Sequence, residues 1–163
     1  RCRWWSRSVI VAGHMGAWWR RHFIVTIQRA PHTMQLRVRF YELDPYNHVN
    51  HSVYVQYFET ARVELLDQVG FSLASMRRDG LSIVVSEIYT KFLAAAEESD
   101  VLTIETEVLQ FRRVTSKWRP RILRGDELIA TQELRAAMIT LEGKPTRFPT
   151  EMLEVMKPFM AAH

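Results

Sequence analysis

Only one stretch of this sequence has the length and apolar spacing of a long amphipathic helix. Its apolar residues recur at i, i+4, i+7 and i+11, as one helix face does: Tyr54, Phe58, Ala61 and Leu65. The spacing predicts a helix over residues 49–69, closed by Gly70 just after its C-cap. This feature limits the fold, because one long helix must bury its apolar face against the strands predicted around it.

The flanking sequence alternates between apolar and polar residues, as strands do. A first strand is predicted at residues 35–42, where Leu36, Val38 and Phe40 alternate with arginines. Four further strands are predicted after the helix, at residues 81–93, 102–108, 114–122 and 128–138. The order predicts an α+β fold in which an antiparallel sheet of about five strands wraps around one long central helix.

Turn and cap residues divide these elements. Ser72 is predicted to cap a short helix at 73–78, and Thr150 a last helix at 151–157. Gly125 and Asp126 predict a hairpin turn. Pro120 is awkward in a central strand and predicts a bulge or an edge.

The loop before the long helix concentrates groups that can do chemistry. Between Asp44 and His51 it contains one acid, two histidines and two amides. The plain interpretation is a solvated turn whose acid caps the helix. The functional interpretation places a carboxylate beside the unpaired N–H groups and positive dipole of a helix N-terminus.

A family resemblance favours the functional interpretation. The segment RFYELDPYNHVNHSVYVQYFETAR, residues 39–62, resembles the signature of hot-dog fold acyl-CoA thioesterases of the 4-hydroxybenzoyl-CoA thioesterase family. On this resemblance Asp44 falls on the catalytic acid, and His51 falls on a histidine that some bacterial members use. Asn47 stands where glycine is usual, and Asn also tolerates a left-handed backbone. Phe40 stands where some members have tyrosine, so that hydroxyl is absent.

The resemblance implies a hot-dog domain over residues 34–163 that hydrolyses an acyl thioester. The amides of Asn50 to Ser52 would polarise the carbonyl, and Asp44 would act as nucleophile or general base. His51 would orient water or substrate, or transfer a proton. The resemblance also implies a homodimer or homotetramer with active sites where two chains meet. Further substrate contacts are predicted from loop and helix residues: Tyr46, His48, Asn50 and Ser52.

Other acids and ligand sets carry less weight. Glu59 and Arg62 are spaced as an ion pair at a surface or interface. The resemblance extends to a related hot-dog group that places its catalytic acid on this helix, which makes Glu59 an alternative catalytic acid. Asp44, His48 and His51 lack the usual helical ligand spacing for metal, and no metal or redox cofactor is expected. No Gly-x-Ser-x-Gly elbow occurs.

A basic cluster offers a site for the phosphates of coenzyme A. It surrounds one predicted hairpin and comprises Arg112, Arg113, Lys117, Arg119 and Arg121. The plain alternative is a solvated sheet face.

Composition limits the partners. The net charge of +4 over 163 residues comes from residues 1–33, which contain six arginines and four of the five tryptophans but no acid. We interpret this segment as a leader or spurious extension, so the high pI is no argument for nucleic-acid binding. No apolar run approaches a membrane span, and the single cysteine suits a cytoplasmic protein.

The sequence therefore predicts a cytoplasmic acyl-CoA thioesterase. Two alternatives remain open from the sequence: a non-catalytic acyl-CoA-binding module of the same fold, and a dehydratase acting on acyl thioesters. Asp44 in the loop favours the enzyme.

Overall fold

The computed structural model describes residues 29–161, so most of the predicted leader lies outside the described residues. The elements follow in chain order: β1 (His32–Arg37), η1 (Phe40–Glu42), α1 (His51–Gln68), α2 (Leu73–Arg78), β2 (Leu81–Phe92), β3 (Val101–Thr106), β4 (Val108–Phe111), β5 (Thr115–Trp118), β6 (Arg121–Arg124), β7 (Glu127–Thr140), α3 (Thr150–Met156) and η2 (Lys157–Phe159). The predicted α+β class is confirmed.

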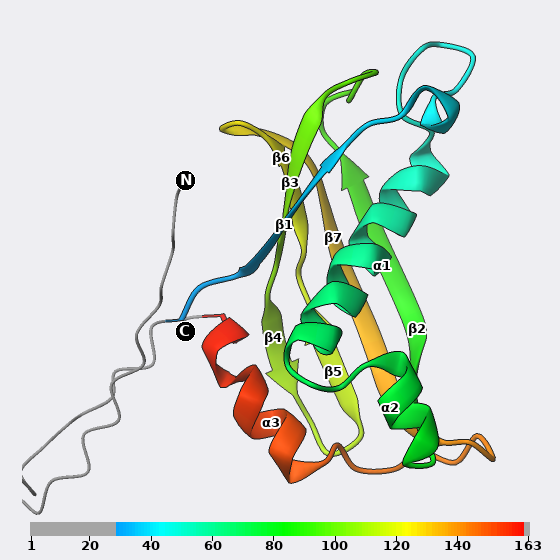
Figure 1. Cartoon of the computed structure of the whole chain (residues 1–163), viewed down its shortest axis with the longest axis vertical. Helices are drawn as coiled ribbons and strands as arrows, with labels where there is room; N and C mark the ends of the chain where they lie inside the picture. The colour runs from blue at the N-terminus through cyan, green and yellow to red at the C-terminus, as the bar shows by residue number, and fades with distance from the viewer. Residues whose placement is uncertain (1–28, 162–163) are drawn as a thin grey trace, which may run out of the picture.

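The strands form one antiparallel sheet that lies against α1 (Figure 1). β1 pairs with β3, β3 with β6 and β6 with β7, while β4 and β5 extend the sheet and β2 pairs with the other side of β7. β3 and β4 are two halves of one path interrupted at Glu107, and β5 and β6 are interrupted at Arg119 and Pro120. When each interrupted path is counted as one strand, the seven strands of the described residues reduce to the predicted five, and the predicted irregularity at Pro120 is also present.

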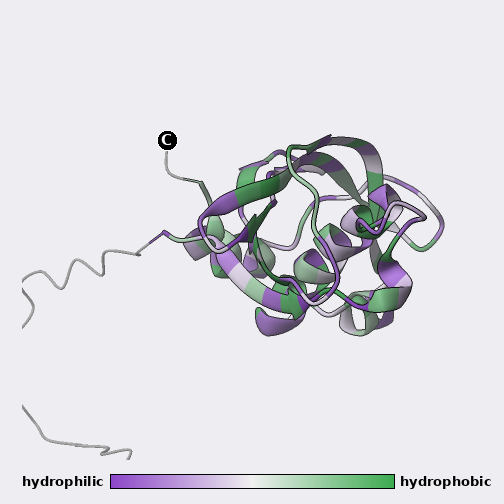
Figure 2. Ribbon diagram, turned by 90° about the horizontal axis from the view of Figure 1, so that it is seen from above, coloured by the Kyte–Doolittle hydropathy of each residue, from purple (hydrophilic) through white to green (hydrophobic). Residues whose placement is uncertain are grey.

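Helix α1 supplies one face to two apolar clusters. Near its start, Tyr54, Phe58 and Ala61 pack with residues of β3, β6 and β7. Near its end, Leu65 and Leu66 join a second cluster that includes Trp118 of β5. Figure 2 shows hydrophobic and hydrophilic residues alternating along the strands, as expected when one sheet face is buried.

The first strand differs from its prediction. It begins earlier, at His32, and ends at Arg37. The chain then turns into η1, where Glu42 accepts a hydrogen bond from the Arg39 N–H at 2.7 Å. Phe40 is consequently 72% exposed instead of lying on a strand face. The alternating pattern could not reveal this turn, because Phe40 continues the period by chance.

The predicted caps are confirmed in two of three cases. Gly70 has φ of 85°, as a residue after a helix C-cap requires, and the Ser72 side chain accepts from the Ser75 N–H. Gly125, with φ of 58°, lies in the two-residue turn between β6 and β7. The prediction for α3 is wrong: Pro149 is its N-cap, and Thr150 is its first residue.

The residue at which β1 begins predicts how removal of the N-terminal residues affects stability. The boundary expected at Met34 falls inside β1, where His32 pairs with Thr106 and is 7% exposed. A chain beginning at Met34 should therefore lose at least about 1 kcal/mol of unfolding free energy relative to one beginning at Arg29. Thermal melts of the two chains check this result. Equal melting temperatures would show that the first residues of β1 do not contribute.

Candidate active site

The loop between η1 and α1 wraps around the Asp44 carboxylate. Its Oδ1 atom accepts hydrogen bonds from the N–H groups of Tyr46 at 2.8 Å and His48 at 3.3 Å. The Asp44 N–H in turn donates to the His48 carbonyl at 2.8 Å. Asn47 adopts φ of 63°, the left-handed conformation that was expected where glycine is usual. No hydrogen bond within residues 29–161 engages the other carboxylate oxygen, Oδ2.

The N-terminus of α1 offers one free amide instead of the expected three. Asn50 is the N-cap, and its side chain accepts from the Ser52 N–H at 2.9 Å. The Asn50 N–H donates to the Glu42 carbonyl, also at 2.9 Å. Among residues 29–161, the His51 N–H has no acceptor. The helix dipole and this one donor therefore point at the loop.

A cavity of about 360 Å³ joins the loop to the sheet. Asp44, His48 and His51 line it from the loop and the start of α1. The end of β2 and the following turn supply the opposite wall, which sequence reasoning missed: Phe92, Leu93, Ala94 and Ala95. The pairing of β2 with β7 and the bond from the Val49 N–H to the Ala96 carbonyl bring this wall to the Asp44 loop, so the local pattern carried no signal beyond an apolar strand end.

Two tyrosines of α1 form hydrogen bonds that hold the segments around the cavity in place. The Tyr54 hydroxyl accepts a hydrogen bond from the Ala96 N–H at 2.9 Å, and its ring lies 5.4 Å from that of Phe92. The Tyr57 hydroxyl donates to the Glu42 carboxylate at 2.6 Å. Burial raises the pKa of Tyr54, and burial together with Glu42 raises the pKa of Tyr57 well above its usual range. Both hydroxyls therefore stay neutral; Tyr57 holds η1 against α1, and Tyr54 holds the turn after β2.

Tyr54 also supports a stability prediction. In Tyr54→Phe, the Ala96 N–H would lose its acceptor in a site where Ala96 is fully buried. Leaving a buried donor unpaired costs roughly 1–3 kcal/mol, which urea unfolding can measure. Tyr41→Phe is the control, because Tyr41 is 62% exposed. Equal unfolding free energies for the two variants would contradict the role given to the Tyr54 hydroxyl.

The remaining predicted substrate contacts lie apart from this cavity. Tyr46 is 80% exposed at the loop surface, and Asn50 and Ser52 bond one another at the helix cap. Arg112 and Arg113 follow β4 at the opposite end of the sheet from the Asp44 loop (Figure 1). Lys117 forms an ion pair with Glu133 at 2.7 Å.

The other members of the basic cluster are paired as well. Arg119 contacts Glu107 at 2.7 Å, and Arg121 contacts Glu105. At Lys117, Arg119 and Arg121 a phosphate would have to displace these carboxylates, which favours the plain interpretation of a solvated sheet face for these three residues. Binding of phosphates by Arg112, Arg113 and Lys117 stays a prediction.

The Glu59 and Arg62 side chains form the expected ion pair, at 3.7 Å. The Glu59 side chain is 64% exposed, whereas Arg62 is only 8% exposed and so does not lie on the open surface of the chain; an interface position stays a prediction. Neither residue lines the Asp44 cavity.

Residues 29–161 contain no group of three or more histidine, cysteine, aspartate or glutamate side chains placed to hold a metal ion. No helix in this part of the chain is both long enough and apolar enough to cross a membrane.

A sheet wrapped on one long helix, with an acid loop at the helix N-terminus, defines a hot-dog fold thioester hydrolase. The chain belongs to the thioesterase-like superfamily, whose family model matches residues 38–156. This membership, together with relatives named as thioesterases, confirms the family, fold and enzyme class predicted from the sequence.

Individual relatives agree with this assignment. A putative esterase of Aquifex aeolicus is 32% identical over 78% of this chain and 98% of its own length. The acyl-CoA thioesterase YbgC of Haemophilus influenzae is 29% identical over 72% of this chain and 88% of its own. The crystal structure of a probable thioesterase from Bartonella henselae has a TM-score of 0.70 at 32% identity, covering 74% of this chain and all of that one.

Proposed function

We propose that the chain hydrolyses acyl-CoA thioesters at the cavity formed by the Asp44 loop, the start of α1 and the end of β2. The proposal is supported by two groups on one cavity wall that have no hydrogen-bond partner among residues 29–161: one carboxylate oxygen and one backbone N–H. Asp44 is held through Oδ1 while Oδ2 has no partner among residues 29–161, and the His51 N–H there has no acceptor. One group can attack or activate water, and the other can receive the carbonyl oxygen.

The reaction needs stabilisation of negative charge on the thioester oxygen. The His51 N–H and the positive end of the α1 dipole supply it, and a preorganised donor of this kind is worth about 100-fold or more in rate. Asp44 either attacks the carbonyl carbon through Oδ2, forming an anhydride that water then opens, or accepts a proton from an attacking water. Either path expels coenzyme A as its thiolate, which takes up a proton.

The His51 imidazole serves as the second polar group of the site. It lines the same cavity as Asp44 and is exposed, so it can orient water or pass a proton to the leaving thiolate. Tyr46 and His48 contribute through the loop backbone that holds Asp44. The site works without metal or redox cofactor in this proposal.

The active unit of the proposal is a homodimer formed through β2. Within residues 29–161, β2 pairs only with β7, which leaves one edge of a twelve-residue strand free. Three apolar residues of β2 lie opposite buried residues of β7 but are themselves exposed: Val85 is 40%, Ile88 46% and Phe92 50% exposed. These side chains lie on the helix face of the sheet, where α1 leaves them partly uncovered, although the Phe92 ring contacts that of Tyr54 at 5.4 Å. A second copy with two-fold symmetry would cover them.

Such a dimer completes the catalytic cavity. Phe92 and Leu93 line it and belong to the β2 edge, so the partner would wall off the acyl group and exclude water. A further doubling to a tetramer and a cytoplasmic location are part of the same proposal. The assignment of coenzyme A as the thiol carrier is supported by the name of the Haemophilus relative.

A hydrolysis screen tests the function. Short, long and aromatic acyl-CoAs are supplied to the purified protein, and free thiol release is followed. We expect turnover with at least one acyl group, and turnover at least about 100-fold lower in an Asp44→Asn variant. The absence of thiol release from every acyl-CoA would contradict the proposal.

A single turnover in heavy-oxygen water tests whether Asp44 is the nucleophile. Attack by Asp44, followed by opening of the anhydride at the Asp44 carbonyl, leaves a heavy oxygen on Asp44 and puts an oxygen of its own carboxylate into the product acid. Activation of water puts the heavy oxygen into the product acid alone, as does opening of the anhydride at the acyl carbonyl. A heavy oxygen on Asp44, detected by mass spectrometry of the protein, therefore identifies attack by Asp44.

A further inference from the structure

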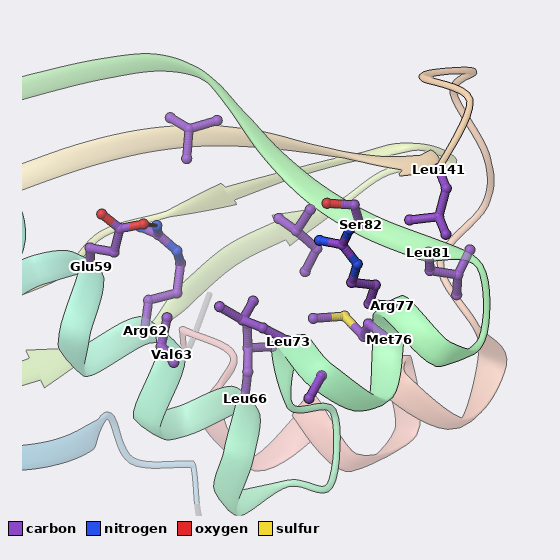
Figure 3. Close-up of a pocket in the computed structure, with 13 residues that line it drawn as sticks. Glu59, Arg62, Val63, Leu66, Leu73, Met76, Arg77, Leu81, Ser82 and Leu141 are labelled. Carbon is purple, nitrogen blue, oxygen red and sulfur yellow. Dashed lines mark ion pairs between the residues drawn. The ribbon is translucent and has the colours of Figure 1, made fainter.

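A second cavity, of about 480 Å³, lies at the other end of β2 from the Asp44 loop (Figure 3). It is enclosed by the C-terminal half of α1, by α2 and by the first residues of β2. Its walls are mainly apolar: Val63, Leu66, Leu73, Met76, Leu81 and Ile83. The volume falls in the usual range for small-molecule pockets, roughly 300–1,000 Å³. The proposed catalytic residues do not line it.

Arg62 is the unusual residue in this cavity. It is 8% exposed, yet its only charged contact among residues 29–161 is the Glu59 carboxylate at 3.7 Å, beyond hydrogen-bonding distance. No acceptor within the described residues forms a hydrogen bond with the Arg62 guanidinium. Burial lowers the pKa of Arg62, and Glu59 only partly opposes this effect. Arg62 is largely buried and lines the cavity, and its guanidinium, which is not itself sealed from solvent, forms no hydrogen bond within residues 29–161, so it can receive an acceptor group there.

The charge balance of the cavity favours an anion. Arg62 and Arg77 both line it, against the single carboxylate of Glu59. Figure 3 shows Arg62 beside Glu59 and Arg77 reaching toward Ser82 on β2, with Leu66 and Leu73 between the two arginines. The Glu59 side chain is 64% exposed, so water screens its hold on Arg62. A planar anion can therefore compete for the guanidinium.

We propose that this cavity binds the carboxylate end of an aliphatic chain. Arg62 would hold the carboxylate through two parallel hydrogen bonds, and the apolar walls would receive the chain. This inference rests on the proposed function in one respect, since acyl thioester hydrolysis releases aliphatic carboxylates. Two sources share this chemistry: the terminal carboxylate of an ω-carboxyacyl substrate, and a free fatty acid.

The dimer geometry makes the first source feasible. Antiparallel pairing of two β2 edges sets the Leu81 end of one strand beside the Phe92 end of the other. The Arg62 cavity of one protomer then adjoins the Asp44 cavity of its partner, because these cavities are lined by opposite ends of β2. An acyl group cleaved at Asp44 could extend into the partner's Arg62 cavity.

Calorimetric titration with decanoate and decanol tests the binding of a carboxylate. We expect wild-type protein to bind decanoate more tightly than decanol, and Arg62→Gln to weaken decanoate binding at least about tenfold with little effect on decanol. Arg62→Lys, which keeps the charge, should retain part of the affinity. Arg78→Gln is the matched control on α2, because Arg78 is exposed and does not line the cavity. Decanoate affinity unchanged in Arg62→Gln would overturn the proposal.

A second variant tests the cavity itself without altering its charges. Ala74 lies exposed at the rim of the cavity on α2, so Ala74→Phe should fill the space. We expect this variant to lose binding of both decanoate and decanol, while circular dichroism and thermal melting stay close to wild type. Wild-type binding in Ala74→Phe would also overturn the proposal. Arg62→Gln should fold, because the carboxylate that it leaves behind already faces water.

Kinetics then identify the source of the carboxylate. If the substrate carries it, Arg62→Gln should raise KM for an ω-carboxyacyl-CoA at least about tenfold and leave KM for decanoyl-CoA unchanged. If a free acid is the ligand, decanoate should alter the rate in wild type but not in Arg62→Gln, and both substrates should behave alike. A protein that hydrolyses no acyl-CoA would contradict the proposed function, yet the decanoate titration would still decide the cavity.

Discussion

Asp44→Asn should reduce the turnover of the best acyl-CoA substrate at least about 100-fold while the protein stays folded. The amide keeps an oxygen that can accept from the Tyr46 and His48 N–H groups, so the loop should retain its shape. It removes the basicity and nucleophilicity of the free oxygen Oδ2. Steady-state rates with circular dichroism spectra of the same samples check the expectation.

A matched substitution separates loss of this carboxylate from a general change in charge. Asp67→Asn removes one negative charge from an exposed position near the end of α1 and should leave the rate unchanged. A folded Asp44→Asn protein with a rate close to wild type would refute the assignment. Glu59 would then become the alternative acid, although it lies outside the Asp44 cavity.

Breaking the β2 interface should remove activity together with the dimer. Lysines in place of Val85 and Ile88 would put charges on the exposed apolar residues of the free edge, and two-fold symmetry would double them. Because Phe92 and Leu93 line the cavity from that strand, we expect the isolated chain to leave the acyl site open to water. Turnover should fall at least about 100-fold, the scale of losing a preorganised site.

Analytical ultracentrifugation beside a rate assay measures both effects on one sample. Val101→Lys is the control, since Val101 is 51% exposed but lies on β3, away from the β2 edge. It should leave both the assembly and the rate unchanged. A monomeric interface variant with full activity per chain would rule out the shared site.

The local features of this protein could be predicted from the sequence because they depend on neighbours in the chain. The apolar spacing of α1, the left-handed backbone at Asn47 and the closing glycine at Gly70 follow from short-range sterics and periodicity. The family resemblance of the Asp44 loop identified the class of enzyme, because the residues that carry it are also neighbours in the chain. A motif of 24 residues contains the carboxylate, the turn and the helix N-terminus.

Features that depend on distant contacts were decided only by the tertiary structure. Phe92 joins the Asp44 cavity because β2 pairs with β7, and Arg62 is buried because α2 and the start of β2 close over α1. The basic residues after β4 read as a cluster in sequence, but cross-strand register gives Lys117 its own carboxylate partner, Glu133. Register, pairing and packing join residues that are far apart in the chain, so alternation shows which faces are apolar but not what each face meets.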